Sequence, residues 1–231
     1  MAGVAQLSAS LDPDHPRLLE IVRPEGLLSA AQMNVIEFHT WNAIKTAINK
    51  PDRMTFDLDP GEGVEWATMQ ESALLVKTML DQLGLKSFVK TSGGKGLHVV
   101  VPLAKRYGWD TVKDFFRAQS LRIWPAHCRC VLVAKSGPRN RAGKIFIDYL
   151  RNGFGATTVC AWSARARPGL GVSVPVGWDE VNRISSGAHW TVANVHTRLD
   201  QGNAPWDAYP ESAQGLASAM KMLDFKPDMP A

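Results

Sequence analysis

The sequence of 231 residues predicts an α+β fold, in which helices flank a mixed or antiparallel central sheet. Three observations lead to this class. Apolar runs of strand length recur along the chain, the clearest at residues 54–58, 85–90, 97–102 and 144–149. A helical pattern over residues 63–83 separates the first two runs, so this part of the chain is strand, helix, strand. The run at 97–102 is apolar on both faces, which favours a place inside the sheet.

The N-terminal part is less regular. Residues 1–16 are small, polar and rich in Pro and Asp, which is typical of a loose terminus. Residues 17–231 are expected to form one domain. Apolar residues recur at helical spacing from 17 to 31, but a proline and a glycine interrupt the pattern and predict two short helical pieces. Residues 32–39 favour a strand that ends at His39, and a histidine there is either a packed residue or a member of a site.

Residues 63–83 give the clearest helix. Its apolar positions step by three and four residues, as in a stripe that faces a core or a sheet, and they are Met69, Ala73, Val76, Leu80 and Leu83. Gly84 follows at once and suits the left-handed conformation that ends many helices. A tight loop at residues 91–96 then joins the strands 85–90 and 97–102.

The second half mixes short elements. Asp110 can cap a helix, because its carboxylate can accept hydrogen bonds from the first free N–H groups. Residues 131–134 fit a strand or a helix equally well, and 144–149 fit a strand. Short helices are expected at residues 178–181, 191–199 and 211–223, the last of them outside the core.

Composition limits the class of protein. There is no run of about 18 apolar residues, so we expect no membrane span, and no secretory leader is visible. Cys128, Cys130 and Cys160 lack zinc-site spacing and are expected to be reduced thiols in the cytoplasm. The net charge is +4, but between Lys135 and Arg167 there are seven basic residues and one acid. This stretch indicates either a polyanion partner, such as nucleic acid or nucleotide, or a solvated basic surface.

The strand at residues 54–60 carries two acids on one face. Side chains alternate along a strand, so Asp57 and Asp59 point one way while Phe56 and Leu58 point the other. Two such carboxylates repel unless a cation lies between them, and hard divalent cations such as Mg²⁺ and Mn²⁺ prefer carboxylate oxygens. The alternative is that the Asp-Pro-Gly sequence at 59–61 simply ends the strand.

The loop at residues 91–96 is the second candidate element. Its glycines permit positive φ and can turn successive backbone N–H groups toward an anion. The side chains of Ser92, Lys95 and His98 would add a hydroxyl, an ammonium and an imidazole. The pattern favours a phosphate cradle, although a flexible hairpin turn would use the same glycines. It is no Walker A loop, because a strand follows it.

Asp148, at the end of the strand 144–149, supplies a third acid, and Arg151 and Arg165 follow it. Three carboxylates could hold two cations, which clamp the attacking and leaving oxygens in a phosphoryl transfer. The arginines would neutralise phosphate charge.

These motifs together resemble the polymerase domain of bacterial ligase D, a member of the archaeo-eukaryotic primase superfamily that acts in non-homologous end joining. The resemblance is carried by three stretches in this order: Asp57-Leu58-Asp59-Pro60, Ser92-Gly93-Gly94-Lys95-Gly96-Leu97-His98, and Phe146-Ile147-Asp148-Tyr149-Leu150-Arg151-Asn152. It extends from about Leu18 to the C-terminal helix and implies a primase-polymerase catalytic core with an RRM-like sheet.

The resemblance also implies roles for individual residues. Asp57, Asp59 and Asp148 would bind two Mn²⁺ or Mg²⁺ ions, and His39 would lie near the reaction centre. The residues that would bind the nucleotide are Ser92, Gly93, Gly94, Lys95, Gly96, His98, Arg151 and Arg165.

The implied reaction is attack of a primer 3′-hydroxyl on the α-phosphate of a nucleoside triphosphate, often a ribonucleotide. The implied partners are that nucleotide, a DNA primer–template or the end of a double-strand break, Ku and a ligase module. Members of this family carry a further N-terminal portion before the position of Leu18, and this portion is expected to be absent here. Two alternatives therefore stay open: a non-catalytic nucleic-acid-binding remnant, and a metal-dependent phosphoesterase that uses the same acids.

Overall fold

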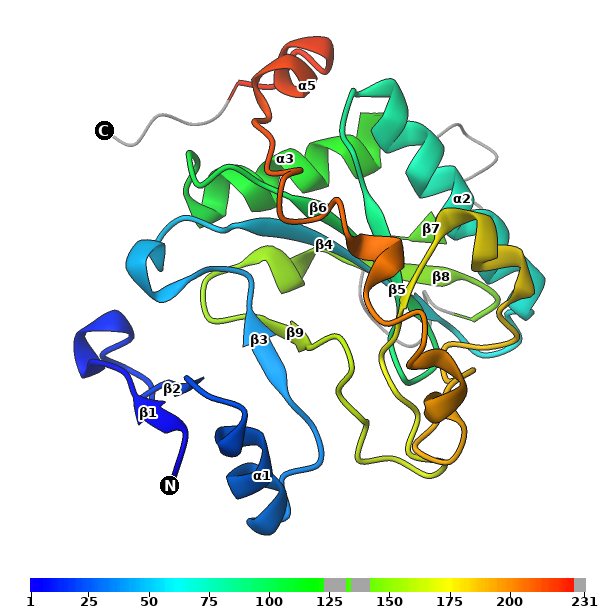
Figure 1. The fold of residues 1–231 in the computed structure, drawn as a ribbon. Coiled ribbons are helices and arrows are strands. Elements are labelled where there is room, and N and C mark those ends of the chain that lie inside the picture. The colour runs from blue at the N-terminus through cyan, green and yellow to red at the C-terminus, as the bar shows by residue number, and fades with distance from the viewer. Residues whose placement is uncertain (123–131, 134–141, 227–231) are drawn as a thin grey trace.

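The computed structural model describes residues 1–122, 132–133 and 142–226. Its centre is a six-stranded sheet in the order β10-β5-β6-β4-β8-β7 (Figure 1). The strands are β4 (Arg53–Pro60), β5 (Phe88–Thr91), β6 (Leu97–Pro102), β7 (Leu132–Val133), β8 (Ile145–Asp148) and β10 (Pro175–Val176). Neighbours are antiparallel except for β7 and β8, which run parallel. The predicted fold class, α+β with a mixed sheet, is confirmed.

The interior position predicted for β6 is also confirmed. All six of its residues are buried, and it pairs with β5 on one side and β4 on the other. Residues 131 and 134 lie outside the described part of the chain, but Leu132 and Val133 between them form a strand, which settles the open choice at those two positions.

Helices α2 (Trp66–Gln82) and α3 (Trp109–Arg122) cover one side of the sheet, and the smaller, two-stranded sheets lie on the other (Figure 1). The predicted apolar stripe of α2 is buried in the core together with Phe56 and Leu58 of β4. Phe116 of α3 packs against Phe56 with ring centroids 4.2 Å apart. Gly84 has φ of +68° just after α2 and ends the helix as predicted. Since Phe56 and Leu58 face the helices, Asp57 and Asp59 face the opposite side.

On that opposite side lies a two-stranded sheet of β3 (His39–Trp41) and β9 (Thr157–Val159). The strand predicted for residues 32–39 is wrong in its bounds, because only residues 39–41 find a partner strand. Gln32, the first residue of the predicted strand, is instead the last residue of helix α1 (Glu25–Gln32), which is followed by Asn34 with φ of 60°. His39 therefore begins a strand rather than ending one.

The N-terminal expectations need two further corrections. Strand β1 (Val4–Gln6) pairs with β2 (Leu19–Ile21), so residues 1–16 are not entirely loose. The first of the two helical pieces expected between 17 and 31 is β2, and only α1 is helical. The pairing joins segments more than ten residues apart, and the composition of either segment alone does not reveal it.

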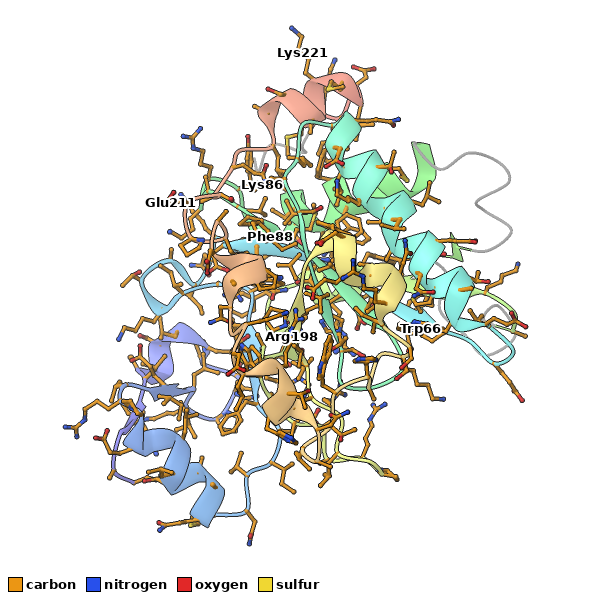
Figure 2. The ribbon with its side chains drawn as sticks, turned by 45° about the vertical axis from the view of Figure 1, so that its right-hand side comes forward. Trp66, Lys86, Phe88, Arg198, Glu211 and Lys221 are labelled. Carbon is orange, nitrogen blue, oxygen red and sulfur yellow. The ribbon has the colours of Figure 1, made fainter. Side chains whose placement is uncertain are left out.

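The C-terminal part crosses the sheet edge in short turns of 3₁₀ helix. These are η5 (Trp178–Arg183), η6 (Val195–Arg198) and η7 (Ala204–Trp206); earlier ones are η1 (Ala9–Leu11), η2 (Lys45–Ala47) and η4 (Tyr149–Asn152). Arg198 lies in the middle of the molecule, whereas Lys221 lies at its upper end (Figure 2). The buried Arg198 guanidinium donates to the Glu180 carboxylate at 2.5 and 2.8 Å and to the Pro175 carbonyl at 3.1 Å, which fastens η6 to η5 and β10.

The last helix, α5 (Ala217–Met222), was expected outside the core over residues 211–223. This expectation is wrong, because Leu216, Ala219 and Met220 are buried in the main core. Gln214, just before the helix, is bridged to Leu103 and holds the segment against the sheet. None of the helices that the structure describes combines the length and the hydrophobicity needed to cross a membrane.

Candidate active site

A row of four ionisable residues crosses the central sheet. Asp57 of β4 lies directly opposite His98 of β6 on one side and Asp148 of β8 on the other. Lys90 of β5 lies opposite His98 and extends the row to a fourth strand. Residues that lie directly opposite each other project to the same face of a sheet. The two acids, far apart in sequence, are therefore neighbours on the face that looks toward β3 and β9.

Asp57 is held in its charged form. His98 Nε2 lies 3.2 Å from its Oδ1, and Arg151 Nε lies 3.5 Å from its Oδ2. Burial raises the pKa of Asp57, but the charges of His98, Arg151 and Lys90 outweigh that effect and bring the pKa down to about 2. His98 lines the cavity described below, where it was predicted to bind phosphate, and its Nε2 lies against Asp57 and orients that carboxylate. Its Nδ1 is buried with no hydrogen-bond partner among the described residues.

Asp148 ends β8 and begins the turn η4. Its Oδ1 accepts a hydrogen bond of 3.0 Å from the N–H of Leu150, as a capping carboxylate does. The turn brings Arg151 back over the sheet, where its Nε lies 3.3 Å from Asp148 Oδ2 as well as near Asp57. One guanidinium thus lies between the two carboxylates.

The donor set fits a hard divalent cation by its chemistry. Asp57 and Asp148 present carboxylate oxygens to a shared position that already holds positive charge, and Asp59 projects to the same face as Asp57, two residues along β4. As the side chains lie, no group of three or more His, Cys, Asp or Glu residues in the described part of the chain is close enough to hold a metal ion. The Arg151 guanidinium supplies the positive charge beside the two carboxylates, and its side chain is 46% exposed to solvent.

The backbone N–H groups of the glycine loop are engaged within the protein. The N–H groups of Gly94 and Gly96 both donate to Ser92 Oγ at 3.1 Å, and that of Gly93 donates to the Gly187 carbonyl at 2.9 Å. In this arrangement the three N–H groups have acceptors inside the protein. A hydroxyl that accepts two hydrogen bonds has its own hydrogen left to donate. Ser92 lines the cavity described below, and its O–H is the group this loop can offer there.

Close packing explains one of the loop glycines. A Cβ on Gly96 would lie 1.9 Å from the Leu58 carbonyl of β4, so any side chain would push the loop off the strand that carries Asp57 and Asp59. Lys95, at the tip of the loop, is exposed. The loop is thus a rigid turn that fixes the position of Lys95 beside the acids.

Two arginines, Arg165 and Arg167, lie over this loop near Gly94. Arg165 Nη1 donates to the Ser92 carbonyl at 3.1 Å, and its Nε lies 2.8 Å from Glu37 Oε1. The same oxygen of Glu37 lies 2.5 Å from Nε2 of His39. Burial raises the pKa of Glu37, but the hydrogen bonds from His39 and the Ala166 N–H, with the charge of Arg165, lower it below its ordinary value.

A cavity opens on this face and collects most of the predicted residues. It is lined by His39, Asp57, Asp59, Ser92, Gly94, Lys95, Gly96, His98, Arg151, Thr157, Thr158, Val159, Arg165 and Arg167. Two predicted site residues do not line it: Asp148 reaches it through Arg151, and Gly93 is packed against Gly171 and Ser173. Lys135, Arg139 and Arg141 of the basic stretch lie outside the described residues.

Sequence reasoning missed Lys90 and Glu37. Lys90 is buried and donates to the Val159 carbonyl at 3.0 Å and to Ser173 Oγ at 2.7 Å, which ties β9 to the central sheet. Burial lowers its pKa to about 7. A lysine within an apolar strand, directly before the loop at residues 91–96, is a sequence signal that could have indicated this role. Nothing near Glu37 in the sequence marks its contact with Arg165.

Comparisons with known proteins place this geometry in context. The family described as "LigD, primase-polymerase domain" matches residues 2–206, and the match includes residues before Leu18, where the resemblance was expected to start. The multifunctional non-homologous end joining protein LigD of Pseudomonas aeruginosa is 49% identical over 224 residues, which are 95% of this chain and 26% of that protein. LigD of Mycolicibacterium smegmatis is 33% identical over 205 residues, or 87% of this chain and 27% of that protein.

The chain therefore spans about a quarter of the length of these curated relatives. Among solved structures, the polymerase domain of Mycobacterium tuberculosis ligase D in complex with DNA matches with a TM-score of 0.71 and 28% identity. That match covers 90% of this chain and 79% of the other. The match supports the same mixed α/β class that the strand order shows.

Proposed function

Because the chain belongs to the family of LigD primase-polymerase domains, we propose that it is a nucleotidyltransferase that adds nucleotides, ribonucleotides among them, to DNA 3′ ends during non-homologous end joining. The observation that carries this proposal is the register of β4 and β8, which sets Asp57 opposite Asp148 beside a cavity edged with lysine and arginine. Paired acids next to a cationic pocket suit a substrate that is both a polyanion and a metal chelator.

Asp57, Asp59 and Asp148 would hold the divalent cations, Mn²⁺ or Mg²⁺. When bound, these ions supply Lewis-acid stabilisation of charge on the attacking and leaving oxygens of phosphoryl transfer. His98 keeps the Asp57 carboxylate in place from its buried position on β6. Arg151 neutralises Asp57 and Asp148, and its half-exposed side chain is long enough to turn from them toward a phosphate.

The triphosphate would lie along the opposite wall of the cavity. Ser92 donates its hydroxyl hydrogen, Lys95 brings an exposed ammonium from the loop tip, and Arg165 presents the N–H groups that the Ser92 carbonyl does not engage. His39, on the neighbouring small sheet, faces the same space. Substrate orientation and charge neutralisation are the contributions these side chains make.

DNA is proposed as the second substrate because the matching ligase D polymerase domain was solved in complex with DNA. Ku and a ligase module are proposed as partners, since the relatives are multifunctional end-joining proteins. We propose a cytoplasmic, nucleoid-associated location on the same grounds.

Primer extension tests the proposal. The chain is mixed with a gapped DNA that carries a 5′-labelled primer, with a nucleoside triphosphate and Mn²⁺, and products are resolved by length. Growth of the primer, absent in Asp148→Asn, is the expected result. DNA binding without growth would favour a non-catalytic remnant, and shortening of the primer would favour a nuclease; both would contradict the proposal.

A further inference from the structure

Glu37 stands between two side chains of the candidate site, His39 and Arg165. Its Oε1 lies 2.5 Å from His39 Nε2 and 2.8 Å from Arg165 Nε. Its Oε2 accepts a hydrogen bond of 2.8 Å from the N–H of Ala166. One carboxylate therefore connects His39, on the small sheet, to the segment that carries Arg165.

The segment around Glu37 is fixed by its backbone as well. The N–H of Phe38 donates to Ser163 Oγ at 2.8 Å, and the Phe38 carbonyl accepts from the N–H of Cys160 at 2.9 Å. Both neighbours lie on the chain between β9 and Arg165. The backbone beside Glu37 is therefore fixed to the segment that carries Arg165, so little backbone entropy has to be lost when Glu37 contacts its partners.

Arg165 is held from two directions. Its Nε is paired with Glu37 by charge, at 2.8 Å but without hydrogen-bond geometry, and the Ser92 carbonyl accepts a hydrogen bond from its Nη1. Its Cγ packs over Gly93, where a Cβ would come within 2.9 Å. The side chain is 14% exposed. These contacts fix the orientation of the guanidinium and so of its remaining N–H groups. Arg165 also lines the cavity. A planar guanidinium binds phosphate well only when its fork is correctly turned.

A carboxylate at this place also has a cost. Glu37 is negative and lies beside a cavity suited to polyphosphate, so by Coulomb's law its charge alone weakens anion binding. Removing that charge without further effect should strengthen binding. A role in orientation predicts the opposite sign, and the two can be distinguished by experiment.

We propose that Glu37 is a positioning residue that sets Arg165 for the triphosphate and His39 for the reaction centre. The proposal rests on the proposed function, because it assigns the roles of the side chains that Glu37 holds. Glu37 acts through those two side chains and does not touch the substrate.

The first test is nucleotide affinity. Glu37→Gln keeps the size of the side chain and removes its charge, and binding of a non-hydrolysable α,β-methylene nucleoside triphosphate is measured by calorimetry. The dissociation constant should rise on the order of tenfold, which corresponds to about 1.4 kcal/mol. Glu62→Gln is the matched control, since exposed Glu62 lines the neighbouring cavity beside Lys95 and loses the same charge. Its dissociation constant should be unchanged or lower. Equal or tighter binding by Glu37→Gln would overturn the proposal.

The second test asks whether Glu37 acts through its two partners. In an Arg165→Gln background, Glu37→Gln should cause no further loss of nucleotide affinity. In a His39→Ala background, it should cause no further loss of kcat in primer extension, although it lowers kcat in the native chain. Losses that simply multiply in both backgrounds would mean a general structural effect and would contradict positioning.

A third measurement needs neither nucleotide nor DNA, so it separates this proposal from the proposed function. Exchange of the Arg165 guanidinium N–H groups with solvent is followed by ¹⁵N NMR in the native protein and in Glu37→Gln. Exchange should be slow in the native protein and at least several times faster in the variant. Equal exchange rates would show that Glu37 does not hold Arg165, whatever the chain catalyses. Slow native exchange in a chain that fails to extend primers would leave the contact intact and remove the proposed function.

Discussion

Asp57 and Asp148 lie directly opposite each other on β4 and β8, and Arg151 contacts both carboxylates, at 3.5 and 3.3 Å. His98 approaches Asp57 from the other side, on β6. An antiparallel pair places such residues about 4.5–5.5 Å apart. Two negative charges at that distance repel unless a cation lies near them. The register therefore requires a positive charge beside the two carboxylates, and Arg151 supplies it in this structure.

The acids should be essential for activity and dispensable for folding. Asp57→Asn or Asp148→Asn should lower the rate of primer extension more than about a hundredfold, because charge stabilisation is usually the largest contribution in such sites. Both variants should keep the native circular dichroism spectrum. Near-native extension by either variant would remove the metal-ligand assignment.

Lys95 should affect nucleotide binding more than turnover. It is exposed at the loop tip beside the acids, so Lys95→Ala should remove one charge-assisted contact and raise the KM for nucleotide by about tenfold. Lys221→Ala is the control, since Lys221 lies on α5 at the upper end of the molecule (Figure 2) and does not line the cavity. A fall in kcat with an unchanged KM would argue against Lys95 as a phosphate ligand.

Two glycines of the same loop should respond differently to alanine. Gly96→Ala puts a Cβ 1.9 Å from the Leu58 carbonyl and should lower the free energy of unfolding by about 3 kcal/mol. Gly94→Ala meets no atom closer than 3.5 Å and should change stability by less than about 0.5 kcal/mol. Urea denaturation of the two variants checks this, and similar losses in both would contradict the close approach of the loop to β4.

Lys90 should make stability depend on pH. Burial lowers its pKa to about 7 from 10.5, so between these values the unfolded chain binds a proton that the folded chain does not. Stability should therefore rise from pH 7 to 9, by at most about 1.4 kcal/mol per pH unit, and be lost as pH falls toward 7. Lys90→Met should flatten this part of the profile, measured by urea denaturation at each pH. The same slope in both proteins would mean that Lys90 keeps an ordinary pKa.

The sequence predicts best what depends on neighbours in the chain. The alternation of Phe56, Asp57 and Leu58 gives the two faces of β4, and the spacing from Met69 to Leu83 with Gly84 gives α2 and its end. Strand β6 is recognised by its apolar residues alone. These features are set by local geometry and by burial on one face.

Features that depend on distant partners could not be derived in this way. The position of Asp148 opposite Asp57 is a matter of register between strands that are far apart in sequence. Strand β1 forms because β2 lies beside it, and β3 begins only at His39 because β9 pairs with residues 39–41. Neither partner can be read from the local sequence. The glycine loop is an example. Its composition predicts a turn, but the direction of its N–H groups depends on their acceptors, Ser92 Oγ and the Gly187 carbonyl.

The most direct test of the central claim is a crystal structure of the protein with Mn²⁺ and a non-hydrolysable nucleoside triphosphate, with anomalous data collected at the manganese edge. The account predicts two manganese peaks about 3.5–4 Å apart, bound by Asp57, Asp59 and Asp148, with the triphosphate against Lys95 and Arg165. Manganese peaks elsewhere, or none at these carboxylates in crystals that hold the nucleotide, would contradict it.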